Sequence, residues 1–454
     1  MTSSFWISPS TATGNNRRIE LTGMDLWLSA RIDNVFVYPS EIKIDQLRQA
    51  LARTLSLWPL VAGRTIFEND RHYIIDMCDN SIPLTFVANN DLKEWPCGSN
   101  VIVEADNKLF ATFIDQVQVT KMFINDPSNE PLLRLKLTYI VQSNEWALGI
   151  SWYHALGDAD ACVRFSNALS RFYQEMEPAQ PLPIFERRLW REDEAHQSVL
   201  RIAKQFQNAK PIDDIAKTSH VQQQDYDPIC MHFSSEQLLT LRKLAGDNSI
   251  TTQDALTAYL ILTLNTHCYH DNEERRILHT VTIVNLHGVS DLIAPAGEVS
   301  NAMFMMVSDD FDDPYSLSSI AKTIRRSILQ SRDCNILEPA IATVDGLMRS
   351  NARTKKMADR RLLANELAVN SNFKYDWANL VDFGLTDRCR FYTAGTRALY
   401  LRVFRLNPTK TGNEWLPRDR DGAEVAFRLE RDLIDKFVHA WQRDLSENFQ
   451  NIKK

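Results

Sequence analysis

The pattern of hydrophobic and polar positions around residue 150 predicts a strand pair followed by a helix. In LLRLKLTYIV, residues 132–141, hydrophobic and polar residues alternate, which is typical of a β-strand. The polar SNE at 143–145 predicts a turn, and WALGISWY at 146–153 predicts the returning strand. Cys162, Phe165, Leu169 and Phe172 then follow helical spacing. The segment SWYHALGDAD, residues 151–160, is therefore expected to be a strand end, a tight loop and a helix start.

Similar patterns predict further helices and strands along the chain. Residues 47–57 have helical spacing, with Asp45 as the expected N-cap, and Pro59 ends this helix before an expected strand at 60–67. In the second half, helices are predicted at 235–245 and 251–268, the latter capped by Thr251 or Thr252. A strand is predicted at 276–286, and a short strand leading into a closing helix is predicted at 423–445.

The order of these elements predicts an α/β or α+β architecture with mixed sheets in two bodies. The chain has 454 residues, which is long enough for two large domains. Residues 196–228 lose hydrophobic density and gain Gln, Lys and Asp, so they are expected to form a crossover linker. The expected domains are residues 1–195 and 229–454, and the segment at about 360–385 of the second domain is a candidate to pack against the first.

Composition excludes several classes of protein. The formal net charge is −7, whereas nucleic-acid-binding proteins usually have a basic surplus. The seven cysteines are scattered and contain no C-x-x-C pair, which favours free thiols in a reducing compartment. The first 18 residues lack the apolar stretch of a secretory signal, and no uninterrupted run of 18 apolar residues predicts a membrane span. We expect a cytoplasmic protein that binds neither nucleic acid nor membrane.

The strand end at Tyr153 places a histidine where it can do acid–base chemistry. His154 follows the hydrophobic strand directly, and histidine is the side chain most easily tuned to exchange a proton near neutral pH. Asp158 follows four residues later, after Gly157, which allows a sharp bend. Asp158 has two possible roles, contacting the imidazole or bracing the loop through an arginine. The spacing alone does not distinguish a functional histidine from an ordinary core histidine.

A second motif lies about 225 residues downstream, where Asp382-Phe383-Gly384 occurs within LVDFGLTDRCRFY. The pair of motifs, His154-x-x-x-Asp158 and Asp382-Phe383-Gly384, resembles the BAHD-type acyl-CoA-dependent acyltransferases, and within that family the fungal, trichothecene acetyltransferase-like members. Four other segments match motifs of that family in the same order: LTGMD at 21–25, LRQALARTLSLWPLVAGR at 47–64, SITTQDALTAYL at 249–260 and DGAEVAFRLERDLIDKF at 421–437. The resemblance covers about residues 20–445.

The resemblance implies two chloramphenicol-acetyltransferase-like domains with a channel between them and the imidazole of His154 at its middle. It implies acyl-CoA as co-substrate, with no permanently bound cofactor, and a small hydroxyl or amine compound of specialised metabolism as acceptor. His154 would be the catalytic general base, acetyl is the favoured acyl group, and a monomer is expected. Gly157, Asp158, Asp382, Phe383 and Gly384 would be structural.

The chain departs from the family pattern near both motifs. Ala159 stands where the family usually has glycine after the aspartate, and Leu385-Thr386 stand in place of Trp-Gly. The family's Arg-x-Arg strand is expected to pair with the aspartate of Asp-Phe-Gly. Here it is replaced by a segment with Asn285 and His287, and we expect one of these two, His287 first, to pair with Asp382. Coenzyme A phosphates prefer Arg, Lys or N–H donors, so Arg388 and Arg390 are candidate CoA-binding residues. Ser371 is a further candidate because it matches the Ser-rich segment that the family has on the CoA side before Asp-Phe-Gly.

Several other functions are compatible with parts of the sequence. Asp158-Ala159-Asp160 is similar to the metal clamp of nucleotide-sugar transferases, but Asp160 lies at a helix start, where an acid is favoured by the helix dipole. HCYH at 267–270 has no second ligand pair at zinc-like spacing, so no metal is expected. Two alternatives remain: a condensation-domain-like enzyme that takes its acyl group from a carrier protein, and a degenerate member that binds CoA or another ligand without turnover.

Overall fold

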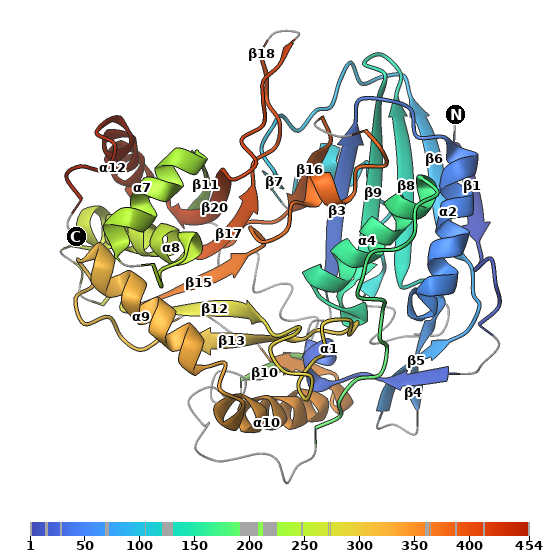
Figure 1. Cartoon of the computed structure of the whole chain (residues 1–454), viewed down its shortest axis with the longest axis horizontal. Helices are drawn as coiled ribbons and strands as arrows, with labels where there is room; N and C mark the ends of the chain where they lie inside the picture. The colour runs from blue at the N-terminus through green and yellow to red at the C-terminus, as the bar shows by residue number, and fades with distance from the viewer. Residues whose placement is uncertain are drawn as a thin grey trace.

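The computed structural model describes residues 2–13, 17–27, 30–68, 72–104, 106–119, 130–190, 208–211, 225–246, 248–270, 272, 274–358, 363, 365–385, 388–411 and 414–452. Within these residues the chain forms two lobes, each built on a mixed β-sheet with helices packed against it (Figure 1). This confirms the predicted α/β class with mixed sheets.

The first lobe contains a seven-stranded sheet in the order β1-β6-β8-β9-β3-β16-β7. Helices α2 (Ile44–Leu57) and α4 (Ala159–Tyr173) pack side by side on this sheet (Figure 1). A three-stranded sheet, in the order β2-β5-β4, lies below it (Figure 1). The strands of the two sheets are β1 (Thr2–Ile7), β2 (Arg17–Glu20), β3 (Arg31–Tyr38), β4 (Arg64–Glu68), β5 (His72–Met77), β6 (Ile82–Asn89), β7 (Ile102–Val103), β8 (Leu133–Ile140), β9 (Glu145–Tyr153) and β16 (Arg390–Ala394).

The second lobe contains a six-stranded sheet in the order β11-β20-β17-β15-β12-β13. Helices α7, α8, α9 and α12 gather on one side of it (Figure 1). The strands are β11 (Tyr226–Phe233), β12 (His279–Asn285), β13 (Met303–Val307), β15 (Glu366–Ser371), β17 (Tyr400–Arg405) and β20 (Ala423–Glu430), and the helices are α7 (Ser235–Ala245), α8 (Thr252–Thr263), α9 (Leu317–Gln330) and α12 (Ile434–Ser446). The long helix α10 (Cys334–Arg353) lies outside this group. The smaller elements of the chain are α1 (Gly23–Trp27), α3 (Lys108–Ala111), β10 (Ala209–Pro211), β14 (Lys356–Ala358), α11 (Trp377–Leu380), β18 (Lys410–Thr411) and β19 (Glu414–Trp415).

The predicted strand–loop–helix around residue 150 is confirmed. β8 and β9 pair antiparallel from Leu133 opposite Trp152 to Ile140 opposite Glu145. A 3₁₀ turn at His154–Leu156 links β9 to α4. The strand that leads to His154 is therefore central in the sheet and held on both sides, because β3 pairs with its other edge.

Two local predictions near residue 50 are corrected. α2 begins at Ile44 with Lys43 at the N-cap, so Asp45 lies in the first turn, where its charge faces the positive helix end, and not at the cap. The expected strand at 60–67 starts only at Arg64, because Pro59–Ala62 form a 3₁₀ turn after the helix. Proline at the first position of this turn has the backbone angle that a helical turn requires.

The two lobes are connected by segments that cross from one to the other. β16 comes from the C-terminal half of the chain but pairs with β3 in the first sheet. Near the N-terminus, α1 packs on α10, which lies beside the second lobe (Figure 1). Most of the predicted linker, residues 196–228, lies outside the described residues.

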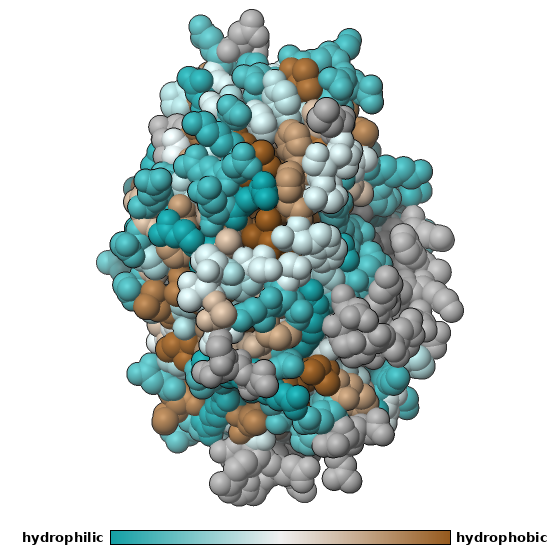
Figure 2. All heavy atoms as spheres, turned by 90° about the vertical axis from the view of Figure 1, so that its right-hand side faces the viewer, coloured by the Kyte–Doolittle hydropathy of each residue, from teal (hydrophilic) through white to brown (hydrophobic). Residues whose placement is uncertain are grey.

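The surface of the first lobe is mainly hydrophilic, with small scattered hydrophobic groups on the face shown in Figure 2. A search of the described residues for a helix with the length and apolarity of a membrane span found none.

Candidate active site

His154 lies where the two lobes meet. It is the first residue after β9, and its backbone N–H donates to the carbonyl oxygen of Ala30 in the first lobe at 3.0 Å. Four residues later, the N–H of Asp158 donates to the carbonyl oxygen of Ser300, which precedes β13 of the second lobe, at 3.2 Å. The loop that carries the imidazole is thus attached to both lobes.

The imidazole of His154 is held through one ring nitrogen. Nδ1 lies 2.9 Å from Oδ1 of Asn301, and no described residue forms a hydrogen bond with Nε2. The residue keeps partial surface exposure, yet its ring lies deep between the lobes, and this burial lowers the pKa of His154 below the ordinary value of 6.5. Hydrogen bonding and the charge of Asp158 offset the effect only in part. The imidazole is therefore neutral at pH 7.

A buried polar network surrounds Asn301. Its Nδ2 donates to the carbonyl oxygen of His154 at 2.8 Å and to Oδ1 of Asp25 at 2.9 Å. The other carboxylate oxygen of Asp25 accepts from the Arg187 guanidinium at 2.6 Å, and the side chains of this ion pair are 0% and 1% exposed. The guanidinium also donates to the carbonyl oxygens of Leu156 and Val299, one on each side of the junction.

Asp158 braces the loop instead of contacting the imidazole. Its Oδ1 accepts from the N–H groups of Asp160 and Ala161, so Asp158 is the N-cap of α4. Its Oδ2 lies 3.2 Å from Nε2 of His287, in the segment after β12. Burial opposes the charge of each partner, but their mutual attraction prevails: the pKa of Asp158 is lowered and the pKa of His287 is raised.

The expectation that His287 or Asn285 pairs with Asp382 is wrong. His287 lies against Asp158, and the Nδ2 of Asn285 donates to the hydroxyl of Tyr375 at 2.7 Å. Asp382 accepts instead from Nε2 of Gln174 at 3.1 Å and from the N–H of Gly384 at 2.8 Å. The segment that stands in place of the family's Arg-x-Arg strand therefore pairs, through His287, with Asp158 and not with Asp382.

The Asp382-Phe383-Gly384 motif forms a tight turn on the first lobe. Phe383 and Gly384 have positive φ angles of 51° and 85°, the left-handed conformation in which glycine costs least. The Phe383 ring is buried and packs edge-on against Tyr38 and Tyr173, with centroids 5.4 and 5.1 Å away. These contacts are structural and place the preceding α11 against α4.

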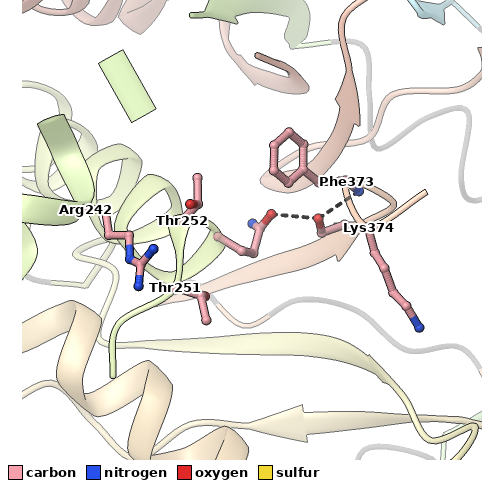
Figure 3. A pocket seen from close by; sticks show the side chains of 7 residues that line it. Arg242, Thr251, Thr252, Phe373 and Lys374 are labelled. Carbon is pink, nitrogen blue, oxygen red and sulfur yellow. Dashed lines mark hydrogen bonds between the residues drawn. The ribbon is translucent and has the colours of Figure 1, made fainter. Parts of the chain in front are cut away.

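Ser371 lines a cavity in the second lobe with a volume of about 410 Å³. The cavity opens between the N-terminal end of α8 and the end of β15 (Figure 3). Ser371 Oγ donates to the side chain of Gln253 at 2.6 Å. Arg242 and Lys374, the two basic residues of the lining, lie on opposite sides of the cavity (Figure 3). Thr251, Thr252 and Phe373 complete the lining.

The two other candidate CoA residues lie in the first lobe around β16. Arg388 is exposed just before this strand. Arg390 is 8% exposed, forms an ion pair with Glu145 and lies over the Trp415 ring at 5.2 Å. Because its charge is already balanced by a carboxylate, Arg390 is less suited than Arg242 or Lys374 to an incoming phosphate.

One group of side chains in the described residues has the types and spacing of metal ligands: Cys230, His232 and Glu424. The Glu424 carboxylate accepts from the N–H groups of Val101 and Ile102, both at 2.8 Å, and lies 3.3 Å from His232 Nε2. Burial and the nearby Glu424 raise the pKa of the Cys230 thiol far above 9.0, which favours the protonated form and not a metal-binding thiolate. The Glu424 carboxylate already has two backbone hydrogen-bond donors, which also makes it a poor metal ligand.

The fold and this site define a two-lobed protein of mixed sheets with a histidine at the junction of the lobes, and comparison with known proteins identifies the family. The profile of the Transferase family matches residues 1–386, and the chain belongs to this family. This confirms the resemblance to BAHD-type acyltransferases.

Solved structures share the fold at low sequence identity. Vinorine synthase is 15% identical, with a TM-score of 0.63 over 96% of each chain. TRI101 of F. graminearum, solved in complex with coenzyme A and T-2 mycotoxin, is 13% identical, with a TM-score of 0.65 over 94% of this chain and 98% of its own. The X-domain from teicoplanin biosynthesis is 12% identical, with a TM-score of 0.56 over 98% and 97% of the two chains. No curated protein sequence matches this chain.

Sequence reasoning identified His154 and Asp158 but missed the network behind them. Asp25 was visible only as part of LTGMD, and neither Arg187 nor Asn301 lies in a segment with a recognisable pattern. Asn301 follows Gly297 in GEVSN, 147 residues after the histidine that it contacts. Only the three-dimensional structure brings these residues together.

Proposed function

We propose that this protein transfers an acyl group, with acetyl favoured, from acyl-CoA to a hydroxyl or amine of a small acceptor, with His154 as general base. The observation that carries this proposal is the state of His154. The ring lies at the junction of the lobes, keeps partial exposure, and has a lowered pKa, so at neutral pH it is ready to accept a proton.

In this mechanism the imidazole removes the proton from the acceptor as its oxygen or nitrogen attacks the thioester carbonyl. The new carbon–oxygen or carbon–nitrogen bond forms, and the tetrahedral intermediate then expels the sulfur of CoA. The imidazolium returns the proton to this thiolate as the carbon–sulfur bond breaks. The products are the acylated acceptor and free CoA thiol, and His154 is neutral again.

We place coenzyme A in the cavity lined by Ser371. Arg242 and Lys374 supply the positive charge that its phosphates require, and Ser371 supplies a hydroxyl. The complex of TRI101 with coenzyme A and T-2 mycotoxin supports a CoA co-substrate and a small-molecule acceptor for a chain of this fold. By the same likeness we place the acceptor among specialised metabolites.

The test is release of free thiol from acetyl-CoA in the presence of a panel of alcohols and amines. His154→Ala should lower turnover about 10²- to 10⁴-fold, the usual contribution of a general base. His439→Ala, which removes an exposed histidine on α12, should leave turnover unchanged. If the wild-type protein binds CoA but releases no thiol with any acceptor, the degenerate-member alternative is correct. If it acts only with an acyl-loaded carrier protein, the condensation-like alternative is correct.

A further inference from the structure

We propose that Asn301 is a positioning residue that fixes the tautomer of His154, with the proton on Nδ1 and the lone pair on Nε2. The functional meaning of this inference rests on the proposed role of His154 as a base. The tautomer itself is a property of the resting protein and can be measured without turnover.

The first step is the orientation of the Asn301 amide. Its Nδ2 lies 2.8 Å from the carbonyl oxygen of His154 and 2.9 Å from Oδ1 of Asp25. Both neighbours can only accept hydrogen bonds. One is a backbone carbonyl oxygen, and the other belongs to the Asp25 carboxylate, whose second oxygen is paired with Arg187. If the amide were flipped, its oxygen would lie against these two acceptor oxygens and could form a hydrogen bond with neither. The NH₂ group must therefore face them, and Oδ1 must face the imidazole.

The orientation of the amide determines the proton on the ring. Asn301 Oδ1 can only accept, so the His154 Nδ1 that lies 2.9 Å away must carry a hydrogen. A neutral imidazole has a single N–H, which leaves Nε2 with its lone pair. Nε2 is also the nitrogen with which no described residue forms a hydrogen bond, so the basic atom is the one left for the acceptor.

The network behind Asn301 prevents rotation of its side chain. Asp25 Oδ1 accepts from both the Nδ2 and the backbone N–H of Asn301, the latter at 3.1 Å. Arg187 fixes Asp25 and also binds the carbonyl oxygens of Leu156 and Val299. Arg187 therefore ties the His154 turn to the segment before Asn301. The distance between the imidazole and the amide is set by a buried charge pair.

This assignment has a kinetic consequence. With the proton on Nε2, the ring would offer an N–H to the acceptor hydroxyl and could not remove its proton. Asn301→Ala removes the acceptor at Nδ1 and lets both tautomers form. We expect kcat to fall on the order of 10²-fold, within the range of acid–base catalysis. KM for either substrate should change less than about threefold, because Asn301 does not contact them in this arrangement.

The most direct test is nitrogen NMR of the histidine rings in the resting, ¹⁵N-labelled protein, with His154→Ala used to assign the signal. The expected spectrum shows a protonated Nδ1 and an unprotonated Nε2 in the wild type. In Asn301→Ala the two shifts should move toward the average of the tautomers. A wild-type ring protonated on Nε2, or an unchanged ring signal in Asn301→Ala, would overturn the proposal.

A matched variant separates positioning from stability. Asn407 is also a buried asparagine, and its Nδ2 donates to the carbonyl oxygens of Ser99 and Phe391, away from His154. Asn407→Ala should lower the free energy of unfolding but leave the ring signal and kcat unchanged. An equal fall of kcat in both variants would contradict a specific role of Asn301. If no acceptor is acylated at all, the proposed function fails, while the ring signal still decides the tautomer.

Discussion

Two buried carboxylates hold the turn that carries His154, and their partners differ in kind. Asp25 is paired with Arg187, and arginine is a side-chain type that is effectively always charged in proteins. Asp158 is paired with His287, whose imidazole loses its charge when the pH rises far enough. The first interaction is a permanent anchor of the site, and the second depends on pH.

The first prediction concerns the permanent anchor. Asp25→Ala should lower the free energy of unfolding by about 3–5 kcal/mol, because it leaves the Arg187 charge buried without a partner. Denaturant unfolding monitored by fluorescence measures the change. Asp227→Ala, which removes the partner of Arg431 on the protein surface, should have a much smaller effect. If the free energy of unfolding fell equally in the two variants, the buried pair would contribute no more to stability than the surface pair, which would contradict the prediction.

The second prediction concerns the pH-dependent pair. Because the folded protein raises the pKa of His287 above its unfolded value near 6.5, the pair stabilises the fold fully below that pH. This stability is lost as the pH rises through the folded pKa, at up to about 1.4 kcal/mol per pH unit. In His287→Arg the charge persists, so the free energy of unfolding should fall less steeply above pH 6.5. Parallel pH profiles for the two proteins would show that His287 is not charged in the folded state.

At the scale of elements, the turn between β9 and α4 is packed too closely for any side chain at residue 157. A Cβ atom at Gly157 would lie 2.6 Å from the Cβ of Ala161 and 3.0 Å from the carbonyl oxygen of Ser300. The turn is thus confined between α4 and the second lobe.

The third prediction follows from this confinement. Gly157→Ala should cost about 1–3 kcal/mol of stability through overpacking, and kcat should fall because the turn that carries His154 must shift. Gly98→Ala is a suitable control, since a Cβ there meets no atom within 4 Å, although its φ of 67° adds some local strain. Unfolding curves and thiol release measure the two effects. A Gly157→Ala protein with wild-type stability and turnover would mean that the turn has room to move.

Elements with a clear hydrophobic period were predictable, and those fixed by distant partners were not. The β8–β9 pair and the helix after it follow from alternation and helical spacing in neighbouring residues. β16 is the opposite case: nothing in RFYTA indicates that it leaves its own lobe to pair with β3. The same limit applies to the site. His154 was marked by its position after a strand, whereas Asn301 reaches it only through the folded arrangement of two lobes.

At the scale of the whole molecule, the proposed chemistry divides between the lobes. His154 belongs to the first lobe, while the cavity that we assign to CoA is lined by residues of the second. The lobes are joined by β16, by α1 and by the Asp158–His287 pair. In the proposed reaction the two lobes must therefore keep a fixed relative position, so that the thioester reaches the imidazole of His154.

The fourth prediction tests the assigned CoA cavity. Arg242→Ala and Lys374→Ala should each raise KM for acetyl-CoA about 10- to 100-fold, the value of a hydrogen bond to a charged group. A short acetyl thioester that lacks the nucleotide should be used equally well by the variants and the wild type. Lys410→Ala, on the exposed strand β18, is the matched control. Unchanged KM values for acetyl-CoA in both cavity variants would place the phosphates elsewhere.

The measurement that tests the central claim most directly is the pH dependence of kcat/KM for thiol release by the wild type and by His154→Ala. Because burial lowers the pKa of His154, the wild-type rate should rise with pH along one limb centred below pH 6.5 and be level at pH 7 and above. The residual rate of His154→Ala should lack this limb. If kcat/KM rose with pH over the same range in both proteins, another group would take the proton, and the account of His154 as the base would be wrong.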